Sequence, residues 1–197
     1  MRKFLTSAAI VFTLSATAYA QDFQRGLTAF NAGDFVTALQ EWRPLAEQGN
    51  AGAQYGLGYM YYIGQGIPED HKEAMKWFHK AAEQGHAHAQ ANLGIMYTIG
   101  QGVPEDHKEA MKWYLKAAEQ GYANSQNSLG AMYENGNGVL HDNVLAHMWY
   151  NIGSANGNEL GSQNRDNLAK RMTPEQIVEA QAMARECMSS DYQNCGQ

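Results

Sequence analysis

The chain has 197 residues, of which 14 are lysine or arginine and 20 are aspartate or glutamate, so its formal net charge is −6. This acidic balance argues against binding to nucleic acid or to anionic lipid through a basic face. The length suits one domain with a continuous hydrophobic core.

The first 20 residues have the features of a signal peptide. A short basic start precedes a largely apolar run over residues 4–14, and Ala18 and Ala20 fit the small-residue site that signal peptidase recognises. A membrane-spanning helix needs about 20 apolar residues, and neither this run nor any later stretch is that long. We therefore expect cleavage after Ala20, no integral membrane segment in the mature chain, and export to the periplasm or beyond. An uncleaved anchor is the alternative.

One segment of the chain returns almost unchanged 36 residues later. QGIPEDHKEAMKWF at 65–78 is followed by QGVPEDHKEAMKWY at 101–114. A fixed period of this length is typical of stacked helical arrays, which mostly act as binding surfaces. The sequence therefore predicts an all-α fold, with a tryptophan of each repeat buried between helices. Four sets of residues keep the same offset: Gln48, Gln84, Gln120 and Asn156; Leu57, Leu93 and Leu129; Tyr61, Tyr97 and Tyr133; Trp77, Trp113 and Trp149.

Each repeat is predicted to contain two helices, A and B, joined by a loop with two glycines. Within 51–62, small and bulky residues alternate with the period of a closely packed helix, which we assign as helix A. Pro68 in the loop prevents this helix from continuing. Asp70 and Glu73 then form a predicted capping box at the start of helix B, which runs from about 71 to 83.

The outer boundaries follow from this register. The third repeat lacks the Pro and Glu that surround the helix B cap, so we expect it to have lost that cap. Near the C-terminus, Thr173 and Gln176 form a predicted capping box for a closing helix. The predicted organisation is a signal peptide at 1–20 and one domain at 21–197, with an N-terminal unit at 22–49, repeats at 51–84, 87–120 and 123–156, capping helices at 159–188 and a tail at 189–197.

The positions that recur between repeats resemble those of the Sel-like repeat family, which is related to the tetratricopeptide repeats and has a longer interhelix loop. The resemblance covers nearly all of residues 21–197 and implies a right-handed α-solenoid of helix-turn-helix repeats. It also implies an adaptor role in protein assemblies, many of them in bacterial envelopes. In the first repeat it rests on Ala53, Leu57, Gly58, Met60, Tyr61, Gly64, Gly66, Ile67, Asp70, Ala74, Trp77, Ala81, Ala82 and Gly85.

No catalytic, cofactor or metal site is expected from the remaining polar residues. His71 and His107 hold equivalent positions in successive repeats, so about 8 to 10 Å of helix packing would separate them, too far to share a zinc ion. His86 and His88 lie two residues apart, where side chains do not face each other on a helix. We expect these histidines to be solvated at the surface. The motifs GxSxG, SxxK and HExxH are absent from the sequence.

Cys187 and Cys195 are the two cysteines of the chain. In an oxidising compartment, cysteines eight positions apart are expected to pair, which would close a small loop between the last helix and the tail. A reactive or metal-binding thiol pair is the alternative, although no CxxC spacing accompanies these residues.

The residues that differ between repeats are the better candidates for function. If the tetratricopeptide pattern applies, helix A faces a concave groove, and tyrosines there would provide amphipathic contacts of the kind enriched at interfaces. Some of these tyrosines could instead pack against the first unit. We predict an exported, non-enzymatic adaptor that binds a protein or peptide partner in the cell envelope. The alternatives are an envelope hydrolase or cell-wall-binding protein, and an organiser that oligomerises through its ends. The predicted partner-binding residues are Tyr55, Tyr59, Tyr62, His88, Asn92, Asn127 and Glu134.

Overall fold

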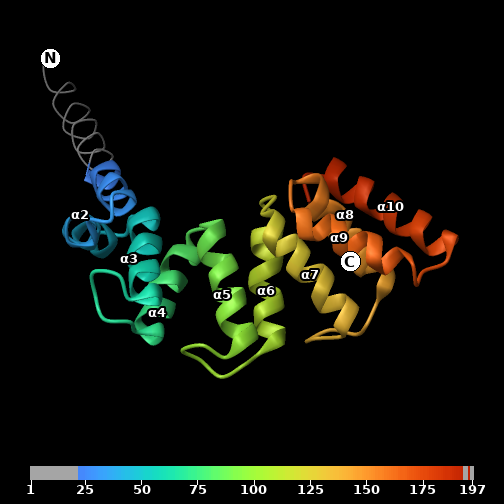
Figure 1. Ribbon diagram of the computed structural model, residues 1–197, viewed down its shortest axis with the longest axis horizontal. Coiled ribbons are helices and arrows are strands. Elements are labelled where there is room, and N and C mark those ends of the chain that lie inside the picture. Colours follow the sequence, from blue (N-terminus) through green and yellow to red (C-terminus); the bar gives the residue numbers. More distant parts are fainter. Residues whose placement is uncertain (1–21, 193–194, 196–197) are drawn as a thin grey trace, which may run out of the picture. The chain divides into compact units, whose positions relative to one another are not determined.

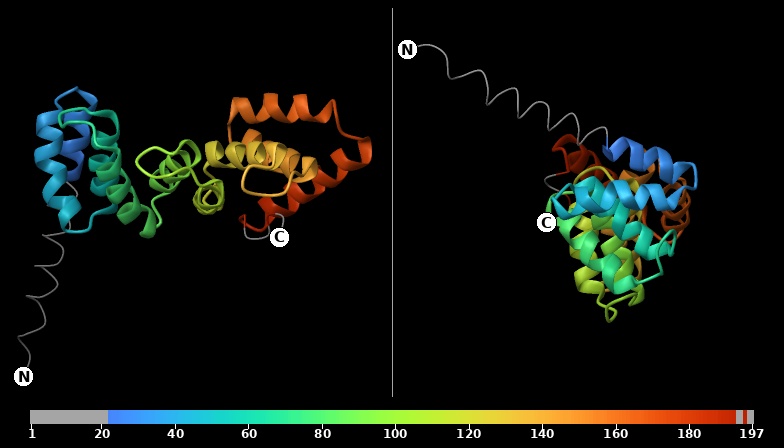
Figure 2. Two further views of the ribbon diagram at one scale, coloured as in Figure 1. Left: turned by 90° about the horizontal axis from the view of Figure 1, so that it is seen from below. Right: turned by 90° about the vertical axis from the view of Figure 1, so that its left-hand side faces the viewer.

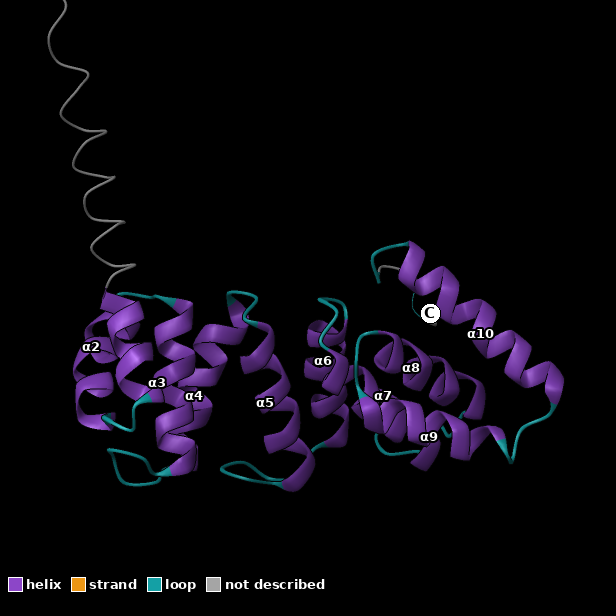
Figure 3. Cartoon of the chain, turned by 45° about the horizontal axis from the view of Figure 1, so that its top comes forward, coloured by secondary structure: helices purple, strands orange, loops and turns teal. Residues whose placement is uncertain are grey.

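The computed structural model describes residues 22–192 and residue 195, and every regular element in that part of the chain is a helix (Figure 3). The chain divides into two compact units, unit 1 ending at Gln84 and unit 2 beginning at Gly85. Within each unit, consecutive helices pack as hairpins, which confirms the predicted all-α solenoid of helix-turn-helix repeats. The predicted signal peptide lies outside the described residues.

Unit 1 consists of two helix pairs. A helix over residues 22–31 precedes α2 (Phe35–Glu47), and α3 (Ala51–Ile63) forms a hairpin with α4 (His71–Glu83), as Figure 1 shows. Helix α3 packs against both α2 and α4, so it holds the unit together. The core of the unit includes Ala38, Trp42, Leu45, Ala46, Ala53, Leu57, Met60 and Trp77.

The loop between α3 and α4 ends one helix and begins the next. Gly64 adopts the left-handed conformation, with φ of 67°, that terminates α3. The Asp70 carboxylate accepts the Glu73 N–H at 3.0 Å and so caps α4, as predicted. The capping box also predicts that the Glu73 carboxylate accepts the Asp70 N–H. This prediction is wrong, because the Asp70 N–H donates to the carbonyl of Tyr61 at 3.0 Å. The Glu73 carboxylate accepts from Lys76 Nζ instead, at 2.7 Å.

Unit 2 repeats the same hairpin twice and then departs from it. Helices α5 (Ala87–Ile99) and α6 (His107–Ala118) form one pair, and α7 (Ala123–Asn135) and α8 (Asn143–Ala155) form the next. Helix α9 (Glu159–Ala169) packs on α8 and α7 in the place of a further helix A. Helix α10 (Pro174–Ser189), red in Figure 2, packs against α8 and makes little contact with α9. The closing helix is therefore not the second half of a regular repeat.

The third repeat keeps its helix B cap. Asp142 accepts the N–H groups of Val144 and Leu145 at 2.8 and 3.0 Å. The prediction that this cap is lost is wrong, because the aspartate alone makes the capping bonds and the neighbouring proline and glutamate add nothing to them. The predicted capping box at the start of α10 is confirmed, with Thr173 and Gln176 bonded in both directions.

A glycine of helix A lets an aromatic ring of helix B come close in every repeat. A Cβ atom at Gly130 would lie 2.4 Å from the ring of Tyr150, closer than real Cβ contacts allow. The small residues of helix A therefore set the spacing of the hairpin. The equivalent pairs are Gly58 with Phe78 and Gly94 with Tyr114.

The tryptophans of the three repeats are buried, as predicted. The exposed fraction is 9% for Trp77, 6% for Trp113 and 0% for Trp149. In the first two repeats, a lysine ammonium covers the indole: Lys80 Nζ lies 3.9 Å and Lys116 Nζ 4.2 Å from the ring. These lysines shield the rings from water and add a favourable cation–π contact.

Cys187 and Cys195 are joined by a disulfide that closes a loop after α10. Cys187 is fully buried in the core of unit 2. Tyr192, inside the loop, places its hydroxyl 2.9 Å from the Nδ2 atom of Asn156, the C-cap residue of α8. Its ring also lies beside Gly121. The disulfide loop thus fixes the end of α10 to the C-terminal end of α8.

Candidate functional site

Tyr55, Tyr59 and Tyr62 are half-buried side chains of α3 in unit 1, and together they form what we call the α3 tyrosine row. The ring centroids of Tyr55 and Tyr59 are 6.1 Å apart. Phe78 of α4 lies 5.8 Å from Tyr55 and 6.2 Å from Tyr62. Phe30 meets Tyr59 edge to face at 6.0 Å. The rings are therefore supported by aromatic neighbours on both sides while part of each tyrosine stays exposed.

The helix that carries the tyrosine row has no charged residue. Helix α4, in contrast, exposes Lys72, Lys76 and Lys80. Lys76 pairs with Glu73 at 2.7 Å on the same surface. Because interface cores are enriched in aromatic residues and depleted in charged ones, α3 has the composition of a contact surface and α4 that of a solvated one.

Two of the predicted partner-binding residues lie on α5 in unit 2. His88 is exposed, and its ring meets that of Tyr122 at 4.9 Å; Asn92, one turn later, is half-buried. His86 caps α5 by accepting the Ala89 N–H at 3.3 Å, and its ring lies 5.9 Å from that of His88. The expectation that these two histidines do not approach is wrong, because His86 lies outside the helix. Burial, followed by the charge of His88, lowers the pKa of His86.

The two predicted residues on α7 are already bonded within unit 2. Asn164 of α9 donates to Asn127, with an Nδ2 to Oδ1 distance of 3.0 Å. The Tyr150 hydroxyl donates to Glu134 at 2.7 Å, and Arg171, just after α9, forms an ion pair with the same carboxylate. Burial, reinforced by the bond to Glu134, raises the pKa of Tyr150 well above its usual value. Helix α9 therefore covers this part of α7.

Buried glutamines on helix A escaped the sequence reasoning. Gln126 donates to the carbonyl of Ala118 in the preceding helix B at 3.0 Å, and its own carbonyl accepts from Asn156 at 2.9 Å. One side chain thus ties a helix A to two helices B. The recurrence of glutamine at 54, 90 and 126 was the signal that could have revealed these residues. The equivalent bonds, both of 2.7 Å, join Gln84 to Gln54 and Gln120 to Gln90.

The histidines at the start of helix B pair with glutamates instead of being freely solvated as expected. His71 Nε2 lies 3.0 Å from Glu69 Oε1, and His107 Nε2 lies 3.0 Å from Glu105 Oε1. Among residues 22–192 and 195, no three His, Cys, Asp or Glu side chains are grouped so that they could hold a metal ion. Within that same part of the chain, no helix has the length and apolar character needed to cross a membrane.

Comparison with known proteins identifies the three repeats as Sel1 repeats. Residues 51–86, 87–122 and 123–158 each match the Sel1 repeat. The crystal structure of a Sel1 repeat protein from Oxalobacter formigenes is similar at 38% identity, with a TM-score of 0.61, over 66% of this chain and 98% of that one. A protective antigen of uropathogenic Escherichia coli with an SLR fold is similar at 28% identity and a TM-score of 0.62, over 98% of this chain and 51% of that one. No curated protein matches the chain significantly.

Proposed function

The chain belongs to the Sel1 repeat family, and we propose that it is an exported, non-enzymatic adaptor that binds a protein or peptide partner in the cell envelope. Sel1 repeat proteins generally act as adaptors between proteins and are typically not enzymes. The observation that carries the proposal for this chain is the α3 tyrosine row, which is ordered by neighbouring rings and stays partly exposed on an uncharged helix.

The tyrosine row suits binding because its side chains are already held in place. Phe30 and Phe78 fix the rings of Tyr59 and Tyr55, so a partner would not have to order them. Ordering a flexible side chain at an interface costs about 0.5–1.5 kcal/mol, which a rigid ring avoids. Tyrosine also offers a hydroxyl for hydrogen bonds beside a large apolar surface, and buried tyrosines are frequent binding hot spots.

The other predicted contact residues divide into two groups. His88 and Asn92 on α5 retain exposed surface and extend the proposal to the helix A face of unit 2. Asn127 and Glu134 are half-buried and already bonded to Asn164 and Arg171, so a partner would have to compete with these bonds. We therefore propose Tyr55, Tyr59, Tyr62, His88 and Asn92 as the contacts made by the protein in this conformation.

Export is the second part of the proposal. It is supported by the basic start, the apolar run and the Ala18–Ala20 site of the N-terminal sequence. It is also supported by the disulfide between Cys187 and Cys195, a bond that forms and persists in oxidising compartments.

A crosslinking pull-down from the native envelope fraction tests the adaptor role. The double variant Tyr55→Ala/Tyr59→Ala should capture at least about tenfold less of the partner that the wild type captures, because each lost hot spot typically weakens binding by at least that factor. Tyr55→Phe/Tyr59→Phe keeps the ring contacts and separates the role of the hydroxyls from that of the rings.

The matched control is Lys72→Ala/Lys76→Ala, which alters the exposed charged surface of α4 in the same unit. It should leave both capture and thermal stability unchanged. If the alanine pair at 55 and 59 instead lowers the melting temperature strongly without any selective loss of a partner, the tyrosines belong to the core. The binding face would then have to be sought on the interhelix loops.

A further inference from the structure

His147 of α8 is a buried titratable group that the proposed adaptor role does not use. Only 2% of its surface is exposed. Its Nδ1 atom finds no hydrogen-bond partner among the described residues. The same position holds Met75 and Met111 in the two preceding repeats. Because an unpaired buried polar atom lowers stability, methionine would fill this place at less cost, and packing alone does not account for the histidine.

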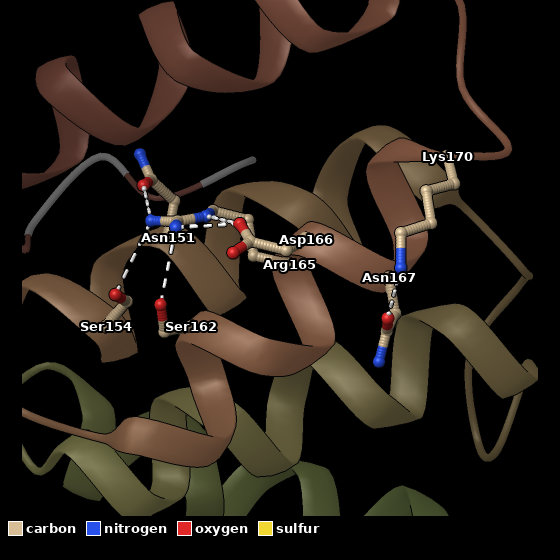
Figure 4. Close-up of polar contacts among 7 residues, drawn as sticks. All are labelled: Asn151, Ser154, Ser162, Arg165, Asp166, Asn167 and Lys170. Atoms are coloured by element: carbon tan, nitrogen blue, oxygen red, sulfur yellow. Dashed lines mark hydrogen bonds and ion pairs between the residues drawn. The ribbon is translucent and has the colours of Figure 1, made fainter.

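A fixed positive charge lies on the same face of α8. His147, Asn151 and Ser154 are spaced four and three residues apart, so their side chains share one face of the helix. Arg165 of α9 rests its guanidinium on that face, with Nη1 3.3 Å from Asn151 Oδ1 and 3.5 Å from Ser154 Oγ (Figure 4). Asp166 holds Nη2 of the same guanidinium at 2.8 Å. The contact between α8 and α9 thus includes a positioned cation.

The charges that face His147 come chiefly from α9. The positive charge of Arg165 disfavours protonation of His147, and the negative charge of Asp166 favours it. On α7, Glu134 is bonded to Tyr150 and Arg171. Burial first, and then the charge of Arg165, lower the pKa of His147. On α10, the charged side chains are all exposed: Glu175, Glu179, Arg185 and Glu186.

We propose that His147 is an acid-sensitive latch that holds α9 against α8 at neutral pH and releases it when the ring is protonated. Protonation puts a second cation, on a ring that is only 2% exposed, on the face that seats Arg165. Helix α9 also carries Asn164 and is followed by Arg171, so its release uncovers Asn127 and Glu134 of α7. A surface that is partly covered near neutral pH thereby opens in acid, whether or not the tyrosine row binds a partner.

The direction of the effect follows from proton linkage. Because the closed state binds the proton on His147 less well than the open state does, closing is fully favoured above the ordinary histidine pKa of about 6.5. The stabilisation is lost as the pH falls below that value towards the lowered pKa of the closed state. The latch therefore works between neutral and mildly acidic pH.

Amide hydrogen exchange of the α9 peptides in the full mature protein tests the latch, with His147→Met as the variant because methionine occupies this position in the other repeats. At a given pH both proteins share the same intrinsic exchange rates, so the ratio of their rates reports opening. Between about pH 7.5 and 5.5, the ratio of wild-type to variant exchange in α9 should rise by about threefold or more.

Two further variants make the result decisive. His86→Asn removes the other histidine whose pKa is lowered and retains a good N-cap for α5, so the pH response of α9 should remain as in the wild type. Arg165→Gln removes the opposing cation and should weaken the pH dependence of amide exchange in α9. If His147→Met does not fold, Arg165→Gln alone provides the test. An α9 exchange ratio that stays constant with pH, or a response that His86→Asn abolishes, overturns the proposal.

Discussion

Replacing Trp149 by alanine gives a quantitative test of the packing in unit 2. The indole is completely buried within a core that also contains Leu129, Met148 and Leu168. Truncating a buried tryptophan typically costs about 3–5 kcal/mol, through lost apolar burial and the cavity left behind. We expect the Trp149→Ala variant to lose this amount of unfolding free energy.

The phenylalanine variant at the same position separates the effect of lost ring volume from that of removing the Nε1–H group. The Trp149 Nε1–H group finds no hydrogen-bond partner among the described residues. Leaving such a group unpaired costs about 1–3 kcal/mol, so its removal offsets part of the lost ring volume. Trp149→Phe should therefore cost less than about 2 kcal/mol, well below the alanine variant.

Urea unfolding followed by circular dichroism measures both variants, and an unchanged m value shows that the change lies in stability. Val178→Ala is the control, because Val178 is 63% exposed on α10, and it should change stability by no more than about 0.5 kcal/mol. A loss below about 1 kcal/mol for Trp149→Ala, or equal losses for alanine and phenylalanine, would refute this account of the core.

Three other outcomes are expected. Mass spectrometry of the exported protein should show a mature chain that starts at Gln21, whereas an intact Met1 would exclude cleavage. Thiol labelling should find neither Cys187 nor Cys195 reactive before or after denaturation without reductant, and replacing both by serine should cost about 2–3 kcal/mol, because the closed loop is short. Gln126→Leu should cost about 1–3 kcal/mol in thermal or urea unfolding, because it removes two buried hydrogen bonds, one to the Ala118 carbonyl and one from Asn156, each worth about 0.5–1.5 kcal/mol; a neutral result would mean that the remaining bonds of these partners, to Gly121 and Tyr192, are sufficient.

Local signals in the sequence were sufficient for most helix boundaries. The residue pattern predicts helix A over 51–62, and α3 spans Ala51–Ile63. It predicts helix B over about 71–83, and α4 spans His71–Glu83. Both limits depend on neighbouring residues: a glycine in the left-handed conformation ends α3 and an aspartate cap begins α4. The errors at Glu73 and in the third repeat arose where a cap had to be inferred from the residues around it.

The predicted contact residues illustrate what local patterns miss. Tyr55, Tyr59 and Tyr62 were placed together by helical spacing alone, and the structure brings them together. That α9 covers Asn127 and Glu134 could not be anticipated, because the bonds to these residues come from side chains 37 positions later in the chain. No local signal specifies such a pair.

The sequence by itself determined the 36-residue period, the alternation of helices A and B and the tryptophans of the core, because a repeat array depends on contacts between near neighbours in the chain. Only the tertiary structure decided that α10 packs on α8, that buried glutamines tie successive helices together, and that His147 lies on the same face as a fixed guanidinium. Each of these depends on the relative orientation of two packed helices. That orientation is set by side-chain packing over the whole helix interface, which no short stretch of sequence specifies.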